Sequence, residues 1–273
     1  MWIHLVVRAR QGCRPLHDDG ACRWLWGRLV AVFPDTLAAV LMPDHLHDIV
    51  EVDCPTGAQR ALARVIAGFG RRFGAGRFAP VPEPALVPDR KHLLRQLRYV
   101  HLNPCRAGLA ADPCEWVWST HRDVIGAVAQ PWVDIRCLTR QLGANPVGFA
   151  SWFHGYVSGD PSVAVSGTRA PIPAASVLVA RVPLAEIAYA AAAATRAPIQ
   201  DLRRRTAARR LFLWVAREQG WSRASELAAI CAISRRAVYK VWSGDPLPGL
   251  GAVRLCLGDR RLTRTFDKRR KAA

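Results

Sequence analysis

The stretch LMPDHLHDIV, residues 41–50, largely determines the fold expected for the N-terminal part of the chain. Its turn-forming tripeptide Met42-Pro43-Asp44 separates two apolar segments, Leu37–Leu41 and Leu46–Val52. Apolar runs of this length on either side of a turn are typical of paired strands. We therefore predict a β-hairpin here.

Two histidines stand directly after this turn. Side chains at positions i and i+2 of a strand point to the same face, about 7 Å apart along the chain. His45 and His47 are therefore expected to face the same way, with Leu46 in the core behind them. Two imidazoles so placed are able to hold one metal ion, but the pair alone is weak evidence for one, and two ordinary surface histidines are the more common case.

Further elements follow from the apolar spacing on both sides of this hairpin. Trp2–Arg8 is apolar and β-branched, which predicts a strand. Three segments with helical spacing predict helices over Asp18–Val32, Ala58–Phe73 and Arg90–Leu102, and Pro80–Pro88 is predicted to be an extended loop. Strands that alternate with helices indicate an α+β class with a mainly antiparallel sheet.

The helix predicted from Arg90 carries a tyrosine. In RKHLLRQLRYVHLN, residues 90–103, Tyr99 and Asn103 are four positions apart and share one helical face. The helix is expected to stop at Asn103-Pro104, because the residue before a proline resists the helical conformation. Taken alone, Tyr99 is also compatible with a half-buried aromatic residue that has no chemical role.

The charge of the chain points to a polyanionic partner. The net charge is +18 and the pI is about 10.8. Residues 181–273 hold 20 basic and 7 acidic residues, a net charge of +13, and residues 1–180 have a net charge of +5. Nucleic acid is the natural partner for such an excess, although free use of arginine on solvated surfaces has the same effect.

The cysteine usage and the hydropathy suggest a cytosolic protein. The eight cysteines are scattered without a C-x-x-C pair, so we expect small buried side chains and neither a disulfide framework nor a zinc framework. No stretch has the length and apolarity of a membrane span, and the N-terminus lacks the basic start of a signal peptide. We expect a cytoplasmic, nucleoid-associated protein that does not bind membranes.

Three motifs in order resemble the REP-associated tyrosine transposases, a branch of the single-tyrosine HUH transposases. They are LMPDHLHDIV, LRYVHLNPCRAGL and WSTHRDVIG, and the resemblance covers about residues 1–126. It implies a ferredoxin-like core and a site in which His45, His47 and Asn103 hold Mg²⁺ or Mn²⁺. It also implies that Tyr99 attacks single-stranded DNA with hairpin or palindromic ends and forms a 5′-phosphotyrosine link.

Several basic residues in this part are candidate phosphate contacts. They are Arg71, Arg72, Arg98 and Arg106, for which a solvated arginine is the plain alternative. The chain departs from the family at Asp44, where Asn is usual, and at Asp48, where an apolar residue is usual. Asp44 either joins the metal site or perturbs it, and Asp48 points away from His47 on a strand and is expected to face solvent.

The segment Val157–Pro183 is rich in proline, serine, glycine and alanine, which predicts a linker. Residues 184–242 beyond it resemble the DNA-binding domain of the replication initiator DnaA. In ELAAICAISRRAVYKVW, Ala232 takes the turn position of a helix-turn-helix and Ser234 the N-cap of its second helix. The expected DNA contacts are Arg235, Arg236, Tyr239 and Lys240, with Arg203, Arg204 and Arg205 on an upstream helix.

Together these patterns predict a transposase domain over residues 1–156, a linker over 157–183, a helix-turn-helix domain over 184–260 and a basic tail over 261–273. The predicted activity is metal-dependent cleavage and transfer of single-stranded DNA, with duplex DNA bound by the C-terminal domain. A non-catalytic DNA-binding regulator and a metal-dependent hydrolase without a covalent intermediate are the alternatives. Both a monomer and a homodimer fit the sequence.

Overall fold

A computed structural model of the chain describes residues 1–128, 131–158, 182–257, 259 and 261. The chain forms two compact units, Met1–Ile125 with Pro131–Ala170 and Gly126–Gln130 with Pro171–Ala273. Of the predicted linker, residues 159–181 lie outside the described residues, as do residues 262–273 of the predicted tail. Within the described part, no helix is both long and apolar enough to cross a membrane.

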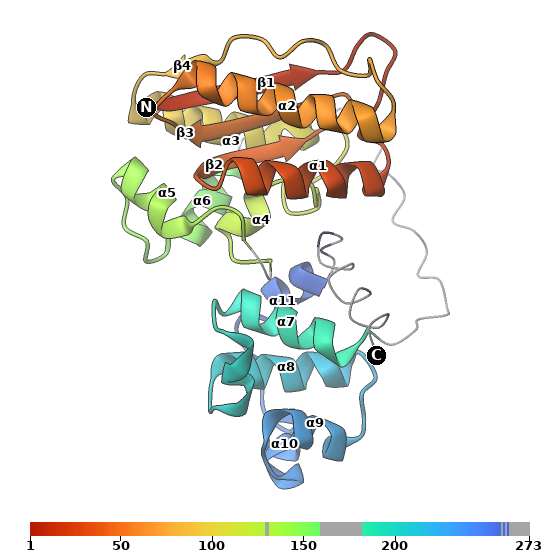
Figure 1. Cartoon of the computed structure of the whole chain (residues 1–273). Helices are drawn as coiled ribbons and strands as arrows, with labels where there is room; N and C mark the ends of the chain where they lie inside the picture. The colour runs from red at the N-terminus through yellow and green to blue at the C-terminus, as the bar shows by residue number, and fades with distance from the viewer. Residues whose placement is uncertain (129–130, 159–181, 258, 260, 262–273) are drawn as a thin grey trace. The chain divides into compact units, whose positions relative to one another are not determined.

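The first unit is built on a four-stranded antiparallel sheet, shown in Figure 1. Its strands are β1 (Trp2–Arg8), β2 (Thr36–Leu41), β3 (His45–Glu51) and β4 (Ala85–Val87), in the order β2-β3-β1-β4. The hairpin predicted around residues 42–44 is present as β2 and β3, which pair in register from Leu41 opposite Leu46. The α+β class is confirmed.

One prediction for the sheet was wrong in part. The predicted loop over residues 80–88 contains β4, which pairs with β1 with Ala85 opposite His4 and Val87 opposite Trp2. The prolines exclude a central strand but permit an edge strand, because one side of an edge strand needs no ladder partner. The free edge of β1 accepts this short strand, and propensity alone does not reveal such pairing.

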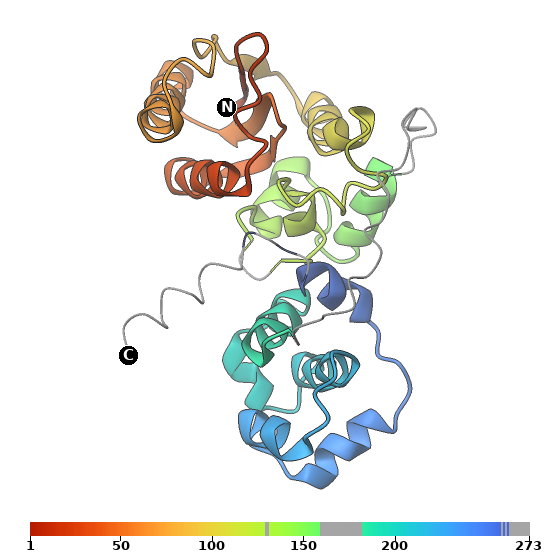
Figure 2. The same ribbon diagram turned by 90° about the vertical axis from the view of Figure 1, so that its right-hand side faces the viewer.

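Helices cover both faces of the sheet (Figures 1 and 2). On one face α1 (Asp19–Val32) and α2 (Pro55–Phe73) bury an apolar core that includes Ile3, Leu5 and Leu46. On the other face α3 (Arg90–Arg106) packs against β2 and β3, over a second core. Residues of β1 and β3 alternate between these two cores, as the period of a strand requires.

The helix α3 runs past the proline at which it was expected to stop. Pro104 lies inside the helix, which ends at Arg106, and the N–H of Ala107 donates to the Asn103 carbonyl at 3.0 Å. A proline costs an internal hydrogen bond and crowds the preceding turn, which usually breaks a helix. Here Leu102, Pro104 and Cys105 are buried, so tertiary packing holds the last turn in place.

The segment after α3 lies along one edge of the sheet. Residues 118–120 run along the outer edge of β2, where the N–H of Leu41 donates to the Trp118 carbonyl at 2.8 Å and that of Thr120 donates to the Ala39 carbonyl at 2.9 Å. Three helices complete the unit, α4 (His121–Val124), α5 (Ile135–Leu142) and α6 (Phe149–Ser158).

The second unit is helical as far as it is described. Its elements are α7 (Leu184–Ala194), the 3-10 helix η2 (Ile199–Arg203), α8 (Ala207–Glu218), α9 (Ala224–Cys231), α10 (Arg235–Trp242) and α11 (Leu250–Leu257). Ala232 ends α9 in the left-handed conformation, with φ of +52°, and Ser234 caps α10 by accepting from the Ala237 N–H. Both positions agree with the sequence prediction.

The upstream helix of this unit differs from its prediction. Thr206 caps α8 by accepting from the Arg209 N–H at 3.3 Å, so α8 begins at Ala207. Arg203 ends the preceding 3-10 helix, and Arg204 and Arg205 lie between the two helices. The expected single helix carrying all three arginines is therefore wrong, because a threonine side chain competes well for backbone N–H groups at a helix start.

Asp48 was expected to face solvent, and the structure corrects this. The sheet is covered on both faces, so the side of β3 opposite His47 points into the core under α1 and α2, where Asp48 is fully buried. The Thr36 hydroxyl donates to Asp48 Oδ1 at 2.9 Å. Burial raises the pKa of Asp48 to about 7, and the hydrogen bond from Thr36 opposes that rise.

This burial predicts a pH-dependent stability. Unfolded Asp48 ionises near pH 3.8 and folded Asp48 near pH 7, so its contribution to the unfolding free energy is intact below pH 3.8 and is lost as pH rises to 7. Asp48→Asn keeps an acceptor for Thr36 without an ionising group. Denaturant unfolding should show the variant gaining stability over wild type across this window, by up to about 4 kcal/mol.

The matched control is Asp53→Asn, since Asp53 is exposed. Its stability should follow wild type at every pH. A constant difference between Asp48→Asn and wild type from pH 4 to pH 8 would contradict the assignment.

Candidate active site

The predicted histidine pair lies on the face of β3 that is turned toward α3. His45 begins the strand and is half-buried, whereas His47 is buried at 2% exposure. Their ring centroids are 4.9 Å apart, with the rings nearly perpendicular. The two imidazoles therefore lie side by side, as the alternation of a strand predicts.

Asp44 orients the first histidine. The Nδ1–H of His45 donates to Asp44 Oδ1 at 2.7 Å. A carboxylate only accepts, so the proton of a neutral His45 ring stays on Nδ1 and the lone pair is left on Nε2. Partial burial opposes ionisation of Asp44, but the hydrogen bond and the charge of His45 outweigh it and lower the pKa of Asp44. The sequence left two roles open for Asp44, joining the metal site or perturbing it, and the geometry adds a third, the orientation of His45.

A third histidine, which the sequence did not suggest, orients the second. His4 Nε2 and His47 Nδ1 form a hydrogen bond of 2.9 Å, and the ring centroids are 5.0 Å apart. His4 comes from β1 and faces the same side because its strand partner is Ile49, two residues after His47. When His47 Nδ1–H donates to His4, the lone pair of His47 is left on Nε2.

Both inner histidines are neutral in this environment. Burial lowers the pKa of His4 to about 4. Burial, followed by the proximity of His4 and His45, lowers the pKa of His47 to about 3. A neutral imidazole is the form that binds a metal ion, so the site offers nitrogen lone pairs at neutral pH.

Tyr99 lies over this pair. Its ring centroid is 5.5 Å from that of His47 in an edge-on arrangement, and its side chain is 37% exposed. The guanidinium carbon of Arg106 lies 5.5 Å from the centre of the Tyr99 ring. The structure thus brings together an accessible phenol, two imidazoles and the guanidinium of Arg106. The helical turn beyond Pro104 carries Arg106.

Asn103 shares the helical face of Tyr99, one turn further along α3. Its side-chain Nδ2 is buried without a hydrogen-bond partner among the described residues, and so is His47 Nε2. An unpaired buried polar atom costs about 1–3 kcal/mol. A cation bound by His45, His47 and the Asn103 amide oxygen would relieve that cost, since amide orientation is assigned from partners. The residues present therefore fit a divalent ion.

The other predicted phosphate contacts of the first unit, Arg71, Arg72 and Arg98, lie elsewhere. The Arg98 guanidinium carbon is 5.0 Å from the centre of the Tyr156 ring, so Arg98 packs toward α6. Arg71 and Arg72 end α2 on the opposite face of the sheet from Tyr99. They line an open hollow of about 570 Å³ together with Trp24, Arg28 and Arg64.

The predicted DNA contacts of the second unit are exposed. Arg235, Arg236, Tyr239 and Lys240 are solvent-exposed on α10, as are Arg203, Arg204 and Arg205 around η2. A hollow of about 820 Å³ runs beside α10 and is lined by Arg217, Arg236, Tyr239, Lys240 and Trp242 among others. These groups are placed to meet a polyanion.

No protein-family model and no curated protein matches the chain. One solved structure that matches is a REP-associated tyrosine transposase bound to a REP hairpin, with 22% identity and a TM-score of 0.39. The match covers 45% of this chain and 78% of that one. A TM-score and an identity this low assign neither a family nor an activity, so the side chains of the site have to carry any functional proposal.

The role of His4 is testable. His4→Phe keeps the ring volume and removes the hydrogen bond to His47, so His47 is no longer held with Nε2 toward the cation position. Loss of such an orienting partner costs about 10–100-fold in metal affinity. Mn²⁺ titration by calorimetry should show this loss, whereas His92→Phe, at an exposed histidine on α3, should bind like wild type. Unchanged affinity in a folded His4→Phe variant would show that His4 does not orient the site.

Proposed function

We propose that the chain is a metal-dependent single-stranded DNA endonuclease and strand transferase that uses Tyr99 as its nucleophile. The observation that carries this proposal is the accessible Tyr99 ring lying 5.5 Å from His47, beside two histidines whose Nδ1 atoms are both hydrogen-bonded. Ordinary surface histidines do not need such partners. An accessible phenol beside a cation site is what nucleophilic attack on phosphorus requires.

The cation, Mg²⁺ or Mn²⁺, would be held by His45, His47 and Asn103. When bound, it would polarise the scissile phosphate and offset the charge that develops on its oxygens. The chain itself supplies the geometry. His4 and Asp44 keep the two ring nitrogens in place, and α3 carries Tyr99 and Asn103 one turn apart. This rigid placement of the nucleophile is the main contribution of the protein to such a displacement.

In the proposed reaction the Tyr99 oxygen forms a bond to phosphorus as the bond from phosphorus to the 3′-oxygen breaks. The phenol proton leaves to solvent, and the departing 3′-oxygen takes up a proton. The product is a 5′-phosphotyrosine link with a free 3′-hydroxyl, so rejoining needs no nucleotide cofactor. Arg106, over the Tyr99 ring, is placed to neutralise the phosphate and the developing phenolate.

The substrate proposal is single-stranded DNA with hairpin or palindromic ends, which rests on the sequence motifs around His45, Tyr99 and Trp118. The second unit is proposed to bind duplex DNA through α10. Its exposed Arg235, Arg236 and Lys240 lie on a helix that follows α9 after the left-handed Ala232. The net charge of +13 over residues 181–273 supports a nucleic-acid contact.

The decisive test of the first unit is Tyr99→Phe. Wild type with Mn²⁺ and a labelled hairpin oligonucleotide should form a protein–DNA adduct that survives a denaturing gel, and the variant should lose it by at least about 10³-fold, because the attacking oxygen is gone. Tyr156→Phe, which removes another phenol of the same unit, is the matched control and should keep the adduct.

The outcomes separate the proposal from its alternatives. Cleavage that persists in Tyr99→Phe without any adduct indicates hydrolysis by water. Wild type that binds the hairpin but neither cleaves nor links it indicates a DNA-binding regulator.

Duplex binding by α10 predicts a salt signature. Removal of one phosphate-binding side chain reduces the slope of log K against log salt by about 0.9, so Arg235→Ala/Arg236→Ala should lower it by about 2 and weaken binding at all sequences. Fluorescence anisotropy at several salt concentrations measures both the affinity for DNA and the slope. Arg223→Ala, at an exposed arginine paired with Glu226, is the control and should leave the slope unchanged. An unaltered slope in the double variant would show that Arg235 and Arg236 of α10 do not contact DNA phosphates.

A further inference from the structure

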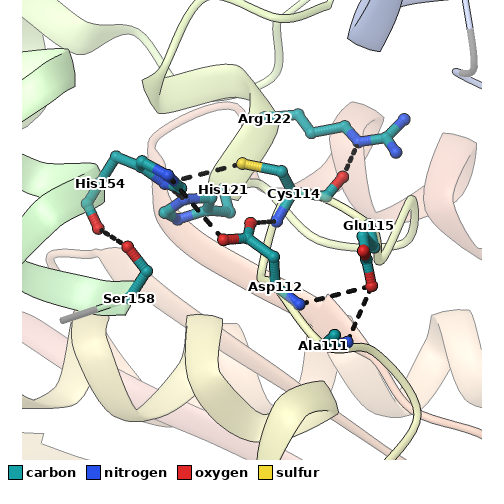
Figure 3. Close-up of polar contacts among 8 residues, drawn as sticks. All are labelled: Ala111, Asp112, Cys114, Glu115, His121, Arg122, His154 and Ser158. Carbon is teal, nitrogen blue, oxygen red and sulfur yellow. Dashed lines mark hydrogen bonds and ion pairs between the residues drawn. The ribbon is translucent and has the colours of Figure 1, made fainter. Parts of the chain in front are cut away.

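Three side chains away from the Tyr99 site bring sulfur and nitrogen atoms together, as Figure 3 shows for Cys114, His121 and His154. The ligand atoms all lie within 4.8 Å of one another, and among the described residues these three are the one such group of histidine, cysteine and acidic side chains. They come from the loop after α3, the first residue of α4 and the middle of α6. The sequence predicted small buried cysteines without a zinc framework, and this cluster departs from that expectation.

The separations match those of a tetrahedral zinc centre. Zn–S bonds of about 2.3 Å and Zn–N bonds of about 2.0–2.1 Å place a sulfur about 3.6 Å from a nitrogen and two nitrogens about 3.3 Å apart. In the structure Cys114 Sγ is 3.6 Å from His154 Nδ1, and His121 Nε2 is 3.0 Å from the same Nδ1. The sulfur–nitrogen edge at His154 has the length that ligation needs, the nitrogen–nitrogen edge is about 0.3 Å shorter than ligation needs, and the third edge is no longer than 4.8 Å.

Asp112 completes the surroundings of the cluster. Its Oδ2 lies 3.9 Å from His154 Nε2, within ion-pair range but longer than a hydrogen bond. Its Oδ1 accepts from the Cys114 backbone N–H at 2.7 Å. A carboxylate that accepts from the second nitrogen of a metal-binding imidazole fixes its tautomer and orientation, and Asp112 would take this role if it moved closer to His154 Nε2 when the ion binds.

We propose that Cys114 Sγ, His121 Nε2 and His154 Nδ1 bind one Zn²⁺ ion, with a water molecule in the fourth position. Sulfur and imidazole donors select a borderline-soft ion, in contrast to the nitrogen and amide-oxygen set beside Tyr99. Binding releases one proton, from the Cys114 thiol, and leaves the imidazole protons on His121 Nδ1 and His154 Nε2. The site is independent of the proposed catalysis.

The proposed ion would have a structural role. It would join α6 to the loop that carries residues 118–120 along the edge of β2. His101 of α3 contacts both parts, since its Nε2 is 3.1 Å from the Thr120 hydroxyl and its ring centroid is 5.4 Å from that of Phe153 in α6. The cluster thus lies behind α3, on the side away from Tyr99.

Cobalt titration of the full chain tests the site without any variant. Co²⁺ replaces Zn²⁺ in such centres, and a thiolate ligand produces a near-ultraviolet charge-transfer band that nitrogen and oxygen ligands do not produce. We expect one equivalent of Co²⁺ to produce this band and one equivalent of Zn²⁺ to abolish it. Absence of the band in folded wild type would overturn the proposal.

Variants locate the ligands. Cys114→Ser should lose the band, and His154→Ala, at a half-buried position that tolerates truncation, should weaken Co²⁺ binding by at least about tenfold. Asp112→Asn should weaken it by about 10–100-fold with the band retained. Cys137→Ser and His45→Ala/His47→Ala are the controls and should keep the band and the affinity. A band that persists in Cys114→Ser, or that disappears in either control, would place the metal elsewhere.

Discussion

The hydrogen bond between His4 and His47 is the interaction on which the proposed chemistry depends. It joins β1 to β3 through side chains in a buried layer, where an unpaired imidazole N–H costs free energy. Because burial lowers the pKa of both rings well below neutrality, neither carries the larger cost of a buried charge. Both rings are therefore stable in the interior, and His47 Nε2 is left without a hydrogen-bond partner among the described residues, on the ring that Tyr99 contacts.

Much of the fold was predictable because strands and helices impose different periods on the apolar residues. The hairpin at residues 42–44, the strand Trp2–Arg8 and the start of α3 follow from that spacing. The features that the sequence analysis did not predict all depend on tertiary contacts. The strand β4 exists because β1 has a free edge, and α3 passes Pro104 because its last turn is buried. Asp48 was misplaced because a sheet covered on both faces has no solvent side.

The site was predictable only where its residues are close in sequence. His45 with His47, and Tyr99 with Asn103, are pairs at strand and helix spacing, so local periodicity placed each pair on one face. His4 is 43 residues from His47, and only the register of β1 against β3 brings them together. The sequence did contain one signal for this contact, because His4 is a histidine within the predicted strand Trp2–Arg8. Cys114 and His154 are 40 residues apart in loop and helix, and no period connects them.

The helix α3 makes contacts on two opposite sides, and these contacts constrain the distance between Tyr99 and His47. On one side Tyr99 lies against His47 and under Arg106, while His101 on the opposite side is fully buried and bonded to Thr120. The hydroxyl of Thr120 also accepts from the Ala39 N–H at 2.8 Å, on the strand next to β3. Tyr99, the proposed nucleophile, and the histidines are thus positioned by the same sheet, Tyr99 through α3 and the edge of β2, the histidines directly. A shift of α3 along its axis that moved Tyr99 away from His47 would therefore also strain the bond between His101 and Thr120.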